Sequence, residues 1–293
     1  MIYVIEPNLS KEKAYQTALA AIAQLKLLHA SVRMSIVYQE AFKDSGVIFC
    51  GPTKLYEHAD FIIAIGGDGT ILRSAGSILE YAEKTHTKPA KIVGINTGTL
   101  GFLATFEANE LDMLNLLESG AYSISERMLL ETSVTDSDGK TLVCRALNDI
   151  YASRINGRIC DFAVSVDGHQ ICVYRADGII FSTPTGSSAY ALSAGGPVME
   201  PDLSVIEMNL ICPHSLFARP MLFSPQRHIS VTCHGVEDED GLRVNVDGTE
   251  AVILHNKQSF TVHVPAISMP FVNLKGHAFY DALNGKLMRP LKR

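Results

Sequence analysis

The sequence lacks the charge and cysteine patterns of several common protein classes. Its formal net charge is -6, which argues against a general nucleic-acid binder, because such a protein carries a basic face. No two cysteines are spaced as Cys-x-x-Cys, so zinc ribbons and thioredoxin-like chemistry find no support. We expect a cytoplasmic protein with reduced thiols. The six cysteines are Cys50, Cys144, Cys160, Cys172, Cys212 and Cys233.

No targeting segment is expected, and several catalytic motifs do not occur in the sequence. Residues 1–7 lack the basic start and long apolar core of a signal peptide, and no apolar run is long enough to predict a membrane span. The motifs Gly-x-Gly-x-x-Gly, His-Glu-x-x-His and Gly-x-Ser-x-Gly do not occur. Gly139-Lys140-Thr141 resembles the end of a Walker A loop, but Val134 stands where that loop needs glycine. The ten histidines show no metal-ligand spacing.

The most informative stretch runs from residue 61 to residue 70. It begins with the apolar run Phe61–Ile65, which is typical of a strand buried on both faces of a parallel sheet. Gly66-Gly67-Asp68-Gly69-Thr70 breaks this run, and apolar residues then recur at helical spacing from Ile71 to Leu79. The sequence therefore predicts a strand, a tight turn and a helix. Asp68 is expected outside the carboxyl end of the strand, where ligands bind in open α/β sheets.

The presence of a carboxylate, that of Asp68, in this turn needs a chemical explanation. Glycines and a helix N-terminus suit a bound phosphate, but a carboxylate repels a bare phosphate. Asp68 could take a proton from an attacking hydroxyl group, or hold a metal ion that travels with the phosphate. The alternative, from this stretch alone, is a simple turn in which Asp68 makes an Asx-type hydrogen bond.

The rest of residues 1–120 alternates between strand and helix patterns, which predicts a doubly wound, Rossmann-like α/β domain. The polar break after residue 95 repeats the strand-to-glycine design of the first turn. We therefore expect the same crevice to be lined by Asn96, Thr97 and Phe102. For Phe102, packing in the core is the simpler alternative. The other predicted elements are strands over 2–5, 35–38 and 91–96, and helices over 11–29 and 111–117.

From residue 121 onward the composition becomes rich in β-formers, and helical periodicity fades. Asp138-Gly139, Asp167-Gly168 and Asp247-Gly248 are hairpin-turn signals between such runs. We predict a mainly antiparallel, β-sandwich-like domain over residues 121–265. Residues 266–293 are expected to form a tail that packs back on the first domain.

A second constellation occupies residues 183–197 within the β-rich part. Pro184 has no N–H to donate to a neighbouring strand, so it ends the preceding strand. Gly186, Gly195 and Gly196 permit close approach of a ligand to the backbone. Tyr190 can stack on a planar ring, and short hydroxyl side chains suit ribose hydroxyls or phosphate oxygens. This combination predicts a nucleotide cradle. The alternative is a serine- and threonine-rich loop with a buried tyrosine. The hydroxyl side chains are those of Thr185, Ser187, Ser188 and Ser193.

Two shorter pairs point in the same direction. Asn148-Asp149 places an amide and a carboxylate after an apolar run, and these groups can read an adenine edge and accept from ribose hydroxyls. Arg175 and Asp177 place a cation and an anion just upstream of the cradle. Alone, either pair is more typical of a surface turn or an ion pair.

In their order and spacing, the glycine turn around Asp68, the pair Asn148-Asp149 and residues 183–193 resemble the NAD kinases. The glycine turn is shared with lipid kinases and phosphofructokinases, whereas the later motif is far more specific. The resemblance implies transfer of a phosphoryl group from ATP, or from inorganic polyphosphate, to the 2′-hydroxyl of the adenosine ribose of NAD. It also implies a divalent metal, normally Mg²⁺, and a homodimer or homotetramer.

The resemblance implies that Asp68 is the proton acceptor for the 2′-hydroxyl. The family usually has Asn-Glu where this chain has Asn148-Asp149, so we expect function to survive with weaker NAD binding. The family also often has glutamine where this chain has Thr249. No residue is assigned as a metal ligand. The binding residues indicated by the motifs and the resemblance are Asp68, Gly69, Asn148, Asp149, Arg158, Arg175, Asp177, Thr185, Ser188, Ala189, Tyr190, Ser193 and Thr249.

The chain has no Walker lysine, so glycine-turn N–H groups, a metal ion and local arginines such as Arg73 are expected to share the phosphate charge. Two other functions compete with an NAD kinase. A non-catalytic dinucleotide sensor would use the same crevice, but it would not need the carboxylate of Asp68. A lipid kinase would share the glycine turn, but it would need an apolar or basic membrane-facing surface that the composition does not indicate.

Overall fold

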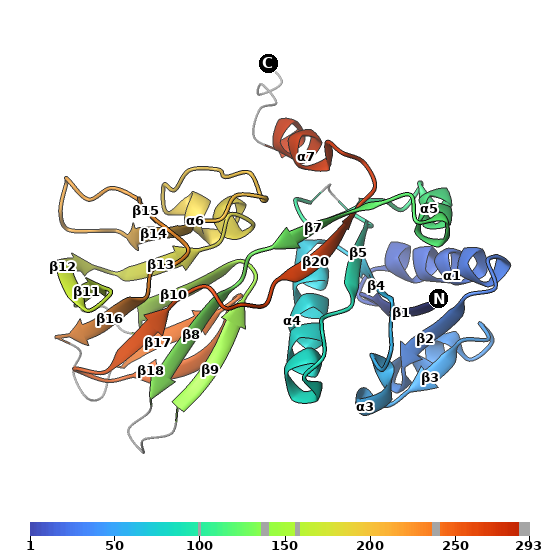
Figure 1. Cartoon of the computed structure of the whole chain (residues 1–293), viewed down its shortest axis with the longest axis horizontal. Helices are drawn as coiled ribbons and strands as arrows, with labels where there is room; N and C mark the ends of the chain where they lie inside the picture. Colours follow the sequence, from blue (N-terminus) through green and yellow to red (C-terminus); the bar gives the residue numbers. More distant parts are fainter. Residues whose placement is uncertain (99–100, 136–140, 156–158, 236–240, 287–293) are drawn as a thin grey trace. The chain divides into compact units, whose positions relative to one another are not determined.

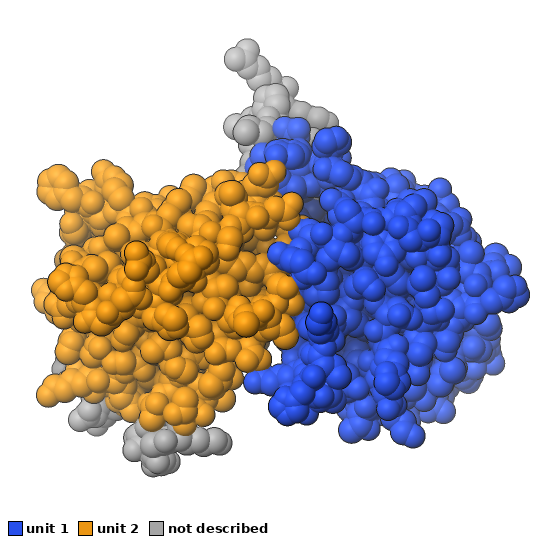
Figure 2. All heavy atoms as spheres, in the orientation of Figure 1, with its two compact units in different colours: residues 1–126, 269–293 blue, residues 127–268 orange. Residues whose placement is uncertain are grey.

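The computed structural model has two compact units (Figure 2), and each has its own hydrophobic core. Unit 1 comprises residues 1–126 and 269–293, and unit 2 comprises residues 127–268. Within the part of the chain that the structure describes, no helix has both the length and the apolar composition needed to cross a bilayer. The residues described are 1–98, 101–135, 141–155, 159–235 and 241–286.

Unit 1 is built on a mostly parallel sheet with the strand order β3-β2-β1-β4-β5-β20-β7, and β6 pairs with β5 (Figure 1). Because the strand order reverses beside β1, the switch point at which ligands bind in such sheets lies between β1 and β4. The strands are β1 (Ile2–Pro7), β2 (Ser31–Ser35), β3 (Ile48–Cys50), β4 (Phe61–Gly66), β5 (Lys91–Asn96), β6 (Phe106–Glu107), β7 (Ser123–Arg127) and β20 (Met269–Asn273).

Helices α1 and α4 cover opposite faces of this sheet. Ile22 of α1 belongs to the same buried cluster as Ile63 of β4. Gly94 of β5 lies on the other face, where an added Cβ would come within 2.5 Å of the Ile71 side chain of α4. Covered on both sides, β4 is buried at all of its positions, as its apolar run predicts. The helical elements are α1 (Glu12–Leu27), η1 (Ile36–Tyr38), α2 (Gln39–Phe42), α3 (Pro52–Leu55), α4 (Asp68–Thr85), η2 (Leu111–Met113), α5 (Leu114–Ser119) and α7 (Ala278–Lys286).

The predicted strand over residues 35–38 is wrong. Strand β2 ends at Ser35, and residues 36–38 form the short helix η1. The Ser35 hydroxyl accepts a hydrogen bond from the N–H of Val37 at 3.5 Å, which favours a turn over a continued strand. Ile36 and Val37 therefore remain largely exposed instead of extending the sheet.

Unit 2 consists of two antiparallel sheets whose inner faces share one core (Figure 1). Strand orders are β15-β14-β13-β10-β17-β18 and β12-β11-β16-β19-β8-β9. Phe181 of the first sheet and Phe260 of the second pack with ring centroids 6.2 Å apart. The elements are β8 (Leu130–Thr135), β9 (Thr141–Ala146), β10 (Asp149–Arg154), β11 (Cys160–Val166), β12 (His169–Ala176), β13 (Gly178–Ser182), η3 (Gly186–Ser188), α6 (Tyr190–Ser193), β14 (Ile206–Ile211), β15 (Met221–Phe223), β16 (Ile229–His234), β17 (Leu242–Val246), β18 (Thr249–Leu254) and β19 (Ser259–Val262).

The predicted fold class, an α/β domain followed by an antiparallel β-sandwich-like domain, is confirmed. Two of the predicted hairpin turns are present as two-residue turns. Asp167-Gly168 joins β11 to β12, and Asp247-Gly248 joins β17 to β18, with positive φ at all four residues. The third, Asp138-Gly139, lies outside the described residues.

Candidate functional site

The glycine turn after β4 places Asp68 at the first position of α4. Gly66 is required there, because an added Cβ would lie 2.3 Å from the Thr70 hydroxyl oxygen one helical turn away. Gly67 is the N-cap in an extended conformation and offers no side chain to cap the helix. The first N–H groups of α4 therefore point out beside a carboxylate, at the positive end of the helix dipole.

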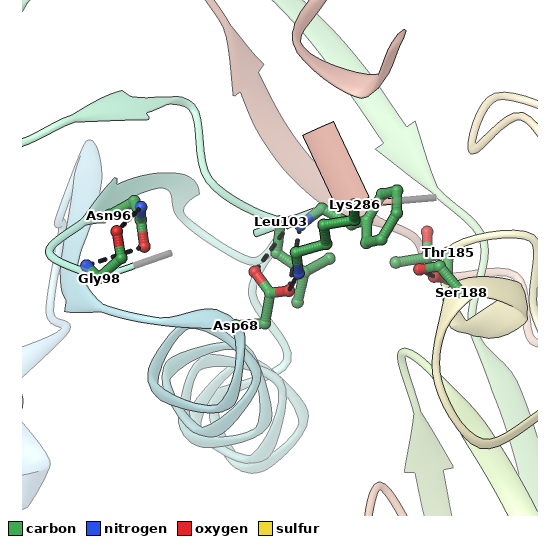
Figure 3. A network of polar contacts seen from close by, with 8 residues as sticks. Asp68, Asn96, Gly98, Leu103, Thr185, Ser188 and Lys286 are labelled. Atoms are coloured by element: carbon green, nitrogen blue, oxygen red, sulfur yellow. Dashed lines mark hydrogen bonds and ion pairs between the residues drawn. The ribbon is translucent and has the colours of Figure 1, made fainter. Parts of the chain in front are cut away.

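Two backbone N–H groups fix the Asp68 carboxylate in unit 1. The N–H of Phe102 donates to Asp68 Oδ2 at 3.0 Å, and the N–H of Leu103 donates to Oδ1 at 3.2 Å (Figure 3). Gly101 makes this approach possible, because an added Cβ would lie 1.8 Å from Asp68 Oδ1. The Asp68 side chain nevertheless keeps 34% of its surface exposed. A carboxylate that is both oriented and accessible can accept a proton from a bound hydroxyl group.

Lys286, at the end of α7, brings a cation to Asp68. Its Nζ lies 3.6 Å from Asp68 Oδ2 (Figure 3) and 4.9 Å from the centre of the Phe102 ring. Helix α7 is held against the same loop by Phe279, whose ring centroid is 6.1 Å from that of Phe102. The sequence analysis predicted a tail that packs back on the first domain, but it missed Lys286, because no local pattern indicates which side chain of that tail reaches Asp68.

The loop after β5 lies next to the glycine turn, as predicted, since Asn96 pairs with Gly66 and the N–H of Thr97 donates to the Gly66 carbonyl at 2.9 Å. Asn96 uses its side chain within its own loop. Its Nδ2 donates to the Gly98 carbonyl at 3.0 Å, and the N–H of Gly98 donates to Oδ1 at 3.3 Å (Figure 3). Thr97 is buried, and its hydroxyl oxygen has no partner among the described residues.

Phe102 contributes its backbone N–H to Asp68 and its ring to the contacts with α7. Arg73 is exposed on α4, and its guanidinium donates to the Thr70 hydroxyl at 3.5 Å. Gly69, next to Asp68, is exposed and has open space where a side chain would begin.

In unit 2, Asp247 organises the segment around Asn148. Its carboxylate accepts from the N–H groups of Leu147 at 2.8 Å, Asn148 at 2.8 Å and Asp149 at 3.1 Å. The left-handed conformation of Asp247 in the β17–β18 turn accompanies this contact. Asn148 then has a buried side-chain oxygen that lacks a partner within the described chain. Buried polar atoms without partners are rare, so this oxygen is available to a ligand.

Asp149 is 4% exposed beside this cluster. Burial and, to a smaller extent, the negative charge of Asp247 raise the pKa of Asp149 to about 7. A hydrogen bond from the backbone N–H of Tyr190 partly opposes this rise. The carboxyl group therefore changes its protonation state near neutral pH and lies within hydrogen-bonding reach of the cradle segment.

The cradle segment begins after β13 and packs closely on the Asn148 segment. The Thr183 hydroxyl donates to the Leu147 carbonyl at 2.6 Å, and the N–H of Gly186 donates to the Thr183 hydroxyl at 3.0 Å. An added Cβ on Gly186 would lie 2.1 Å from the Asn148 carbonyl oxygen. The two sequence motifs of unit 2 therefore form one structural feature, as their shared chemistry suggests.

The side chains of the cradle segment differ in exposure. Thr185 is buried, and its hydroxyl oxygen has no partner in the described part of the chain. The Ser188 hydroxyl donates to the Thr185 carbonyl at 3.5 Å (Figure 3). Tyr190 is 39% exposed, and its ring packs edge-on against Tyr151 with centroids 5.0 Å apart. Ala189 is half-buried and Ser193 is exposed at the end of α6.

Three of the remaining candidates, Arg175, Asp177 and Thr249, lie on or next to strands of unit 2. Arg175 on β12 forms a two-pronged ion pair with Asp161, at 2.8 and 2.9 Å. Asp177 forms an ion pair with Arg154 at 3.0 Å, whereas the ion pair of Arg175 is with Asp161. Thr249 is exposed at the start of β18, directly after the Asp247-Gly248 turn. Arg158 lies outside the described residues.

Two family profiles match the chain. Residues 10–115 match the profile described as ATP-NAD kinase N-terminal domain, and residues 147–274 match that of the ATP-NAD kinase C-terminal domain. The chain is 35% identical to the NAD kinase of Moorella thermoacetica over 288 residues, which cover 96% of this chain and 87% of that one. It is 32% identical to the NAD kinase of Thermoanaerobacter sp. strain X514 over 289 residues, with 96% of each chain covered.

Two solved structures share the fold. The structure of an NAD kinase from Archaeoglobus fulgidus in complex with ATP has a TM-score of 0.71 and 26% identity, covering 97% of each chain. That of yeast NADH kinase complexed with NADH has a TM-score of 0.90 and 23% identity, covering 100% of this chain and 90% of the yeast chain. At that identity the yeast structure supports the fold alone.

Proposed function

The chain belongs to the NAD kinase family, and we propose that it transfers the γ-phosphoryl group of ATP to the 2′-hydroxyl of the adenosine ribose of NAD. The product of this reaction is NADP. NAD and ATP are the substrates that membership of the family implies. The observation that carries the proposal is an oriented, partly exposed carboxylate, Asp68, at the N-terminus of α4.

Asp68 is the proposed proton acceptor for the 2′-hydroxyl. Each carboxylate oxygen already accepts one backbone N–H, and each keeps a second lone pair for a substrate hydroxyl. The two fixed hydrogen bonds hold the carboxylate in one orientation, which reduces the reorganisation needed when a hydroxyl arrives. A positioned general base contributes about 10²- to 10⁴-fold to such a transfer.

Lys286 is the proposed cation for the transferred phosphoryl group. Its ammonium group lies 3.6 Å from the carboxylate that would take the hydroxyl proton. Negative charge spreads over the phosphoryl oxygens in the transition state, and a cation fixed at that position stabilises it. Lys286 would therefore provide the positive charge that a Walker lysine provides in other phosphoryl-transfer enzymes.

The NAD site is proposed on unit 2, around Asn148 and the cradle segment. The support is chemical: Asn148 Oδ1 and Thr185 Oγ1 are buried acceptors without partners in the described chain, and Asp149 adds a carboxylate next to Tyr190. Ribose hydroxyls and an adenine edge would satisfy these groups. The proposed NAD-contacting residues are Asn148, Asp149, Arg158, Arg175, Asp177, Thr185, Ser188, Ala189, Tyr190, Ser193 and Thr249, with Asp68 and Gly69 at the reacting hydroxyl.

A divalent ion, most simply Mg²⁺, is proposed to accompany the phosphates of the donor. The described residues contain no cluster of three or more histidine, cysteine, aspartate or glutamate side chains that would form a cage by itself. Mg²⁺ is commonly held by one or two carboxylates together with substrate phosphates, and Asp68 fits the part of that carboxylate. When bound, the ion would neutralise charge on the phosphates.

We further propose a cytoplasmic homo-oligomer, a dimer or a tetramer. The support for self-association is an exposed apolar tip in the loop between β14 and β15, where Leu216 and Phe217 are 87% and 88% exposed. Free thiols at all six cysteines are compatible with a reducing compartment. Light scattering after size-exclusion chromatography measures the oligomer mass directly.

An endpoint assay tests the proposed activity. The purified chain is incubated with NAD, ATP and Mg²⁺, and the product is read by a dehydrogenase that accepts only NADP, which makes the readout specific for the 2′-phosphate. We expect a signal that disappears when any one component is omitted. A stabilising thermal shift with NAD but no NADP, with either ATP or polyphosphate, would instead identify a dinucleotide sensor.

A further inference from the structure

Helix α7 buries little surface of its own, although it carries Lys286 to Asp68. Of its nine residues, all of which the structure describes, only Ala282 is buried. Gly285 lies in its last turn, and glycine lowers the stability of a helix. Isolated helices shorter than about 12–15 residues are only marginally stable in water. The position of α7, and with it that of Lys286, therefore depends on a few specific contacts.

The strand that leads into α7 is anchored in the sheet of unit 1. Strand β20 runs parallel to β5. The buried Thr105 hydroxyl donates to the Val272 carbonyl at 3.2 Å and accepts from the N–H of Gly94 at 3.1 Å. The chain is therefore fixed as far as the end of β20, and the turn over residues 274–277 sets the direction in which α7 leaves the sheet.

An ion pair between Lys275 and Glu110 holds this turn. Lys275 Nζ lies 2.6 Å from Glu110 Oε1 and 2.5 Å from Oε2, and the N–H of Glu107 donates to Oε2 at 2.9 Å. Burial acts to raise the pKa of Glu110, but these hydrogen bonds lower it below its ordinary value, which favours the ionised carboxylate. The two side chains are only 28% and 30% exposed, so salt screens their attraction less than that of a surface pair.

This ion pair and the contact of Lys286 with Asp68 lie at opposite ends of α7. At the far end, Lys286 Nζ is 3.6 Å from Asp68 Oδ2 (Figure 3). Between the two ends, the rings of Phe279 and Phe102 pack with centroids 6.1 Å apart. A helix of nine residues is about 13 Å long, so a tilt of about 10° at the turn moves its far end by about 2 Å. A displacement of that size takes the ammonium group out of ion-pair distance of the carboxylate.

We propose that Lys275 and Glu110 are positioning residues for the phosphoryl transfer: their ion pair fixes the turn into α7 and thereby holds Lys286 beside Asp68. The inference rests on the proposed function, because Lys286 is the cation proposed for the transferred phosphoryl group. Lys275 and Glu110 act through Lys286 and need no contact with a substrate. A misplacement of about 1 Å, caused by a residue remote from the chemistry, can lower a rate about 100-fold.

Variants at Lys275 test this role. Lys275→Gln removes the ammonium group, whereas Lys275→Arg keeps a charge that can contact both carboxylate oxygens. Lys43→Gln is the matched control, because it removes an exposed ion pair of unit 1, with Glu40. Steady-state assays measure kcat, calorimetry measures the dissociation constant of NAD, and circular dichroism shows whether each variant is folded. Hydrogen exchange detected by mass spectrometry measures the opening of residues 278–286 and requires no activity.

We expect Lys275→Gln to lower kcat about tenfold, with the dissociation constant of NAD within about twofold of the wild type, and Lys275→Arg to recover most of the loss. Because Lys275 acts through Lys286, adding Lys275→Gln to Lys286→Gln should change kcat by less than about twofold. Hydrogen exchange over residues 278–286 should be at least about fivefold faster in Lys275→Gln and unchanged in Lys43→Gln.

An unchanged kcat or unchanged hydrogen exchange in folded Lys275→Gln would overturn the proposal. A further loss of about tenfold in the double variant would also overturn it, because Lys275 would then act independently of Lys286. If the wild type makes no NADP but Lys275→Gln exchanges faster over residues 278–286, the proposed function is contradicted, whereas the positioning of α7 by this ion pair is supported.

Discussion

The protonation of Asp149 is predicted to control NAD binding near neutral pH. Burial beside Asp247 raises the pKa of Asp149 to about 7 in the free protein. The proposed ribose contact needs the ionised carboxylate, because only that form accepts hydrogen bonds at both oxygens. Binding of NAD then requires the loss of a proton from Asp149 whenever the pH is below its pKa.

The size of the effect follows from this pKa. Each pH unit below about 7 should weaken NAD binding tenfold, which corresponds to about 1.4 kcal/mol. Between pH 8 and pH 5.5 the dissociation constant of NAD should therefore rise by roughly 30-fold, or about 2 kcal/mol. Calorimetry in two buffers of different ionisation enthalpy, at pH 6, should also detect proton release on binding.

Asp149→Asn removes the titrating group without changing the size of the side chain. We expect a flat dependence of NAD affinity on pH for this variant, with binding weaker than that of the wild type at pH 8. Asp112→Asn, at an exposed carboxylate on η2, serves as the matched control and should keep the slope of the wild type. A flat profile in the wild type, or an unchanged slope in Asp149→Asn, would refute this role of Asp149.

Three further predictions concern stability and the Asp68 region. Because the pKa of Asp149 is raised from 3.8 to about 7 on folding, its ionisation destabilises the fold as pH rises through that window. Urea unfolding should show Asp149→Asn gaining stability over the wild type from pH 4 to pH 8, by up to about 4 kcal/mol. Lys286→Gln should lower kcat about 100-fold while NAD affinity stays within threefold, and Lys286→Arg should recover part of the loss. Equal steady-state kcat values for Lys286→Gln and the wild type would exclude the proposed role. Gly101→Ala should lower kcat about 100-fold by displacing the Asp68 carboxylate, whereas Gly98→Ala in the same loop, where an added Cβ has its nearest neighbour at 3.7 Å, should retain most activity.

Local patterns predicted the parts of the molecule that depend on local physics. An apolar run followed by glycines places Asp68 at the start of α4, directly after β4, because a buried parallel strand and a helix start each have their own signature. The turns at Asp167-Gly168 and Asp247-Gly248 were predicted for the same reason. The positions of side chains at the ends of helices and strands can therefore be predicted from the sequence.

Contacts between distant segments could not be predicted. Asp247 was interpreted as a turn residue, yet its carboxylate holds three N–H groups that are 98 to 100 residues away in the chain. A returning tail was predicted over residues 266–293, but the contact of Lys286 with Asp68 depends on the packing of α7 on Phe102, which no periodicity near Lys286 encodes. The partners of Arg175 and Asp177, which are Asp161 and Arg154, depend on neighbouring β-strands and loops in the same way.

The most direct test of the central claim compares the wild type with Asp68→Asn. Steady-state formation of NADP from NAD and ATP measures the chemistry, and calorimetric titration with NAD measures binding in the same preparations. The account predicts that Asp68→Asn loses at least about 100-fold in kcat while its NAD dissociation constant stays within a few-fold of the wild type. Retention of wild-type kcat by folded Asp68→Asn would contradict the assignment of Asp68 as the proton acceptor.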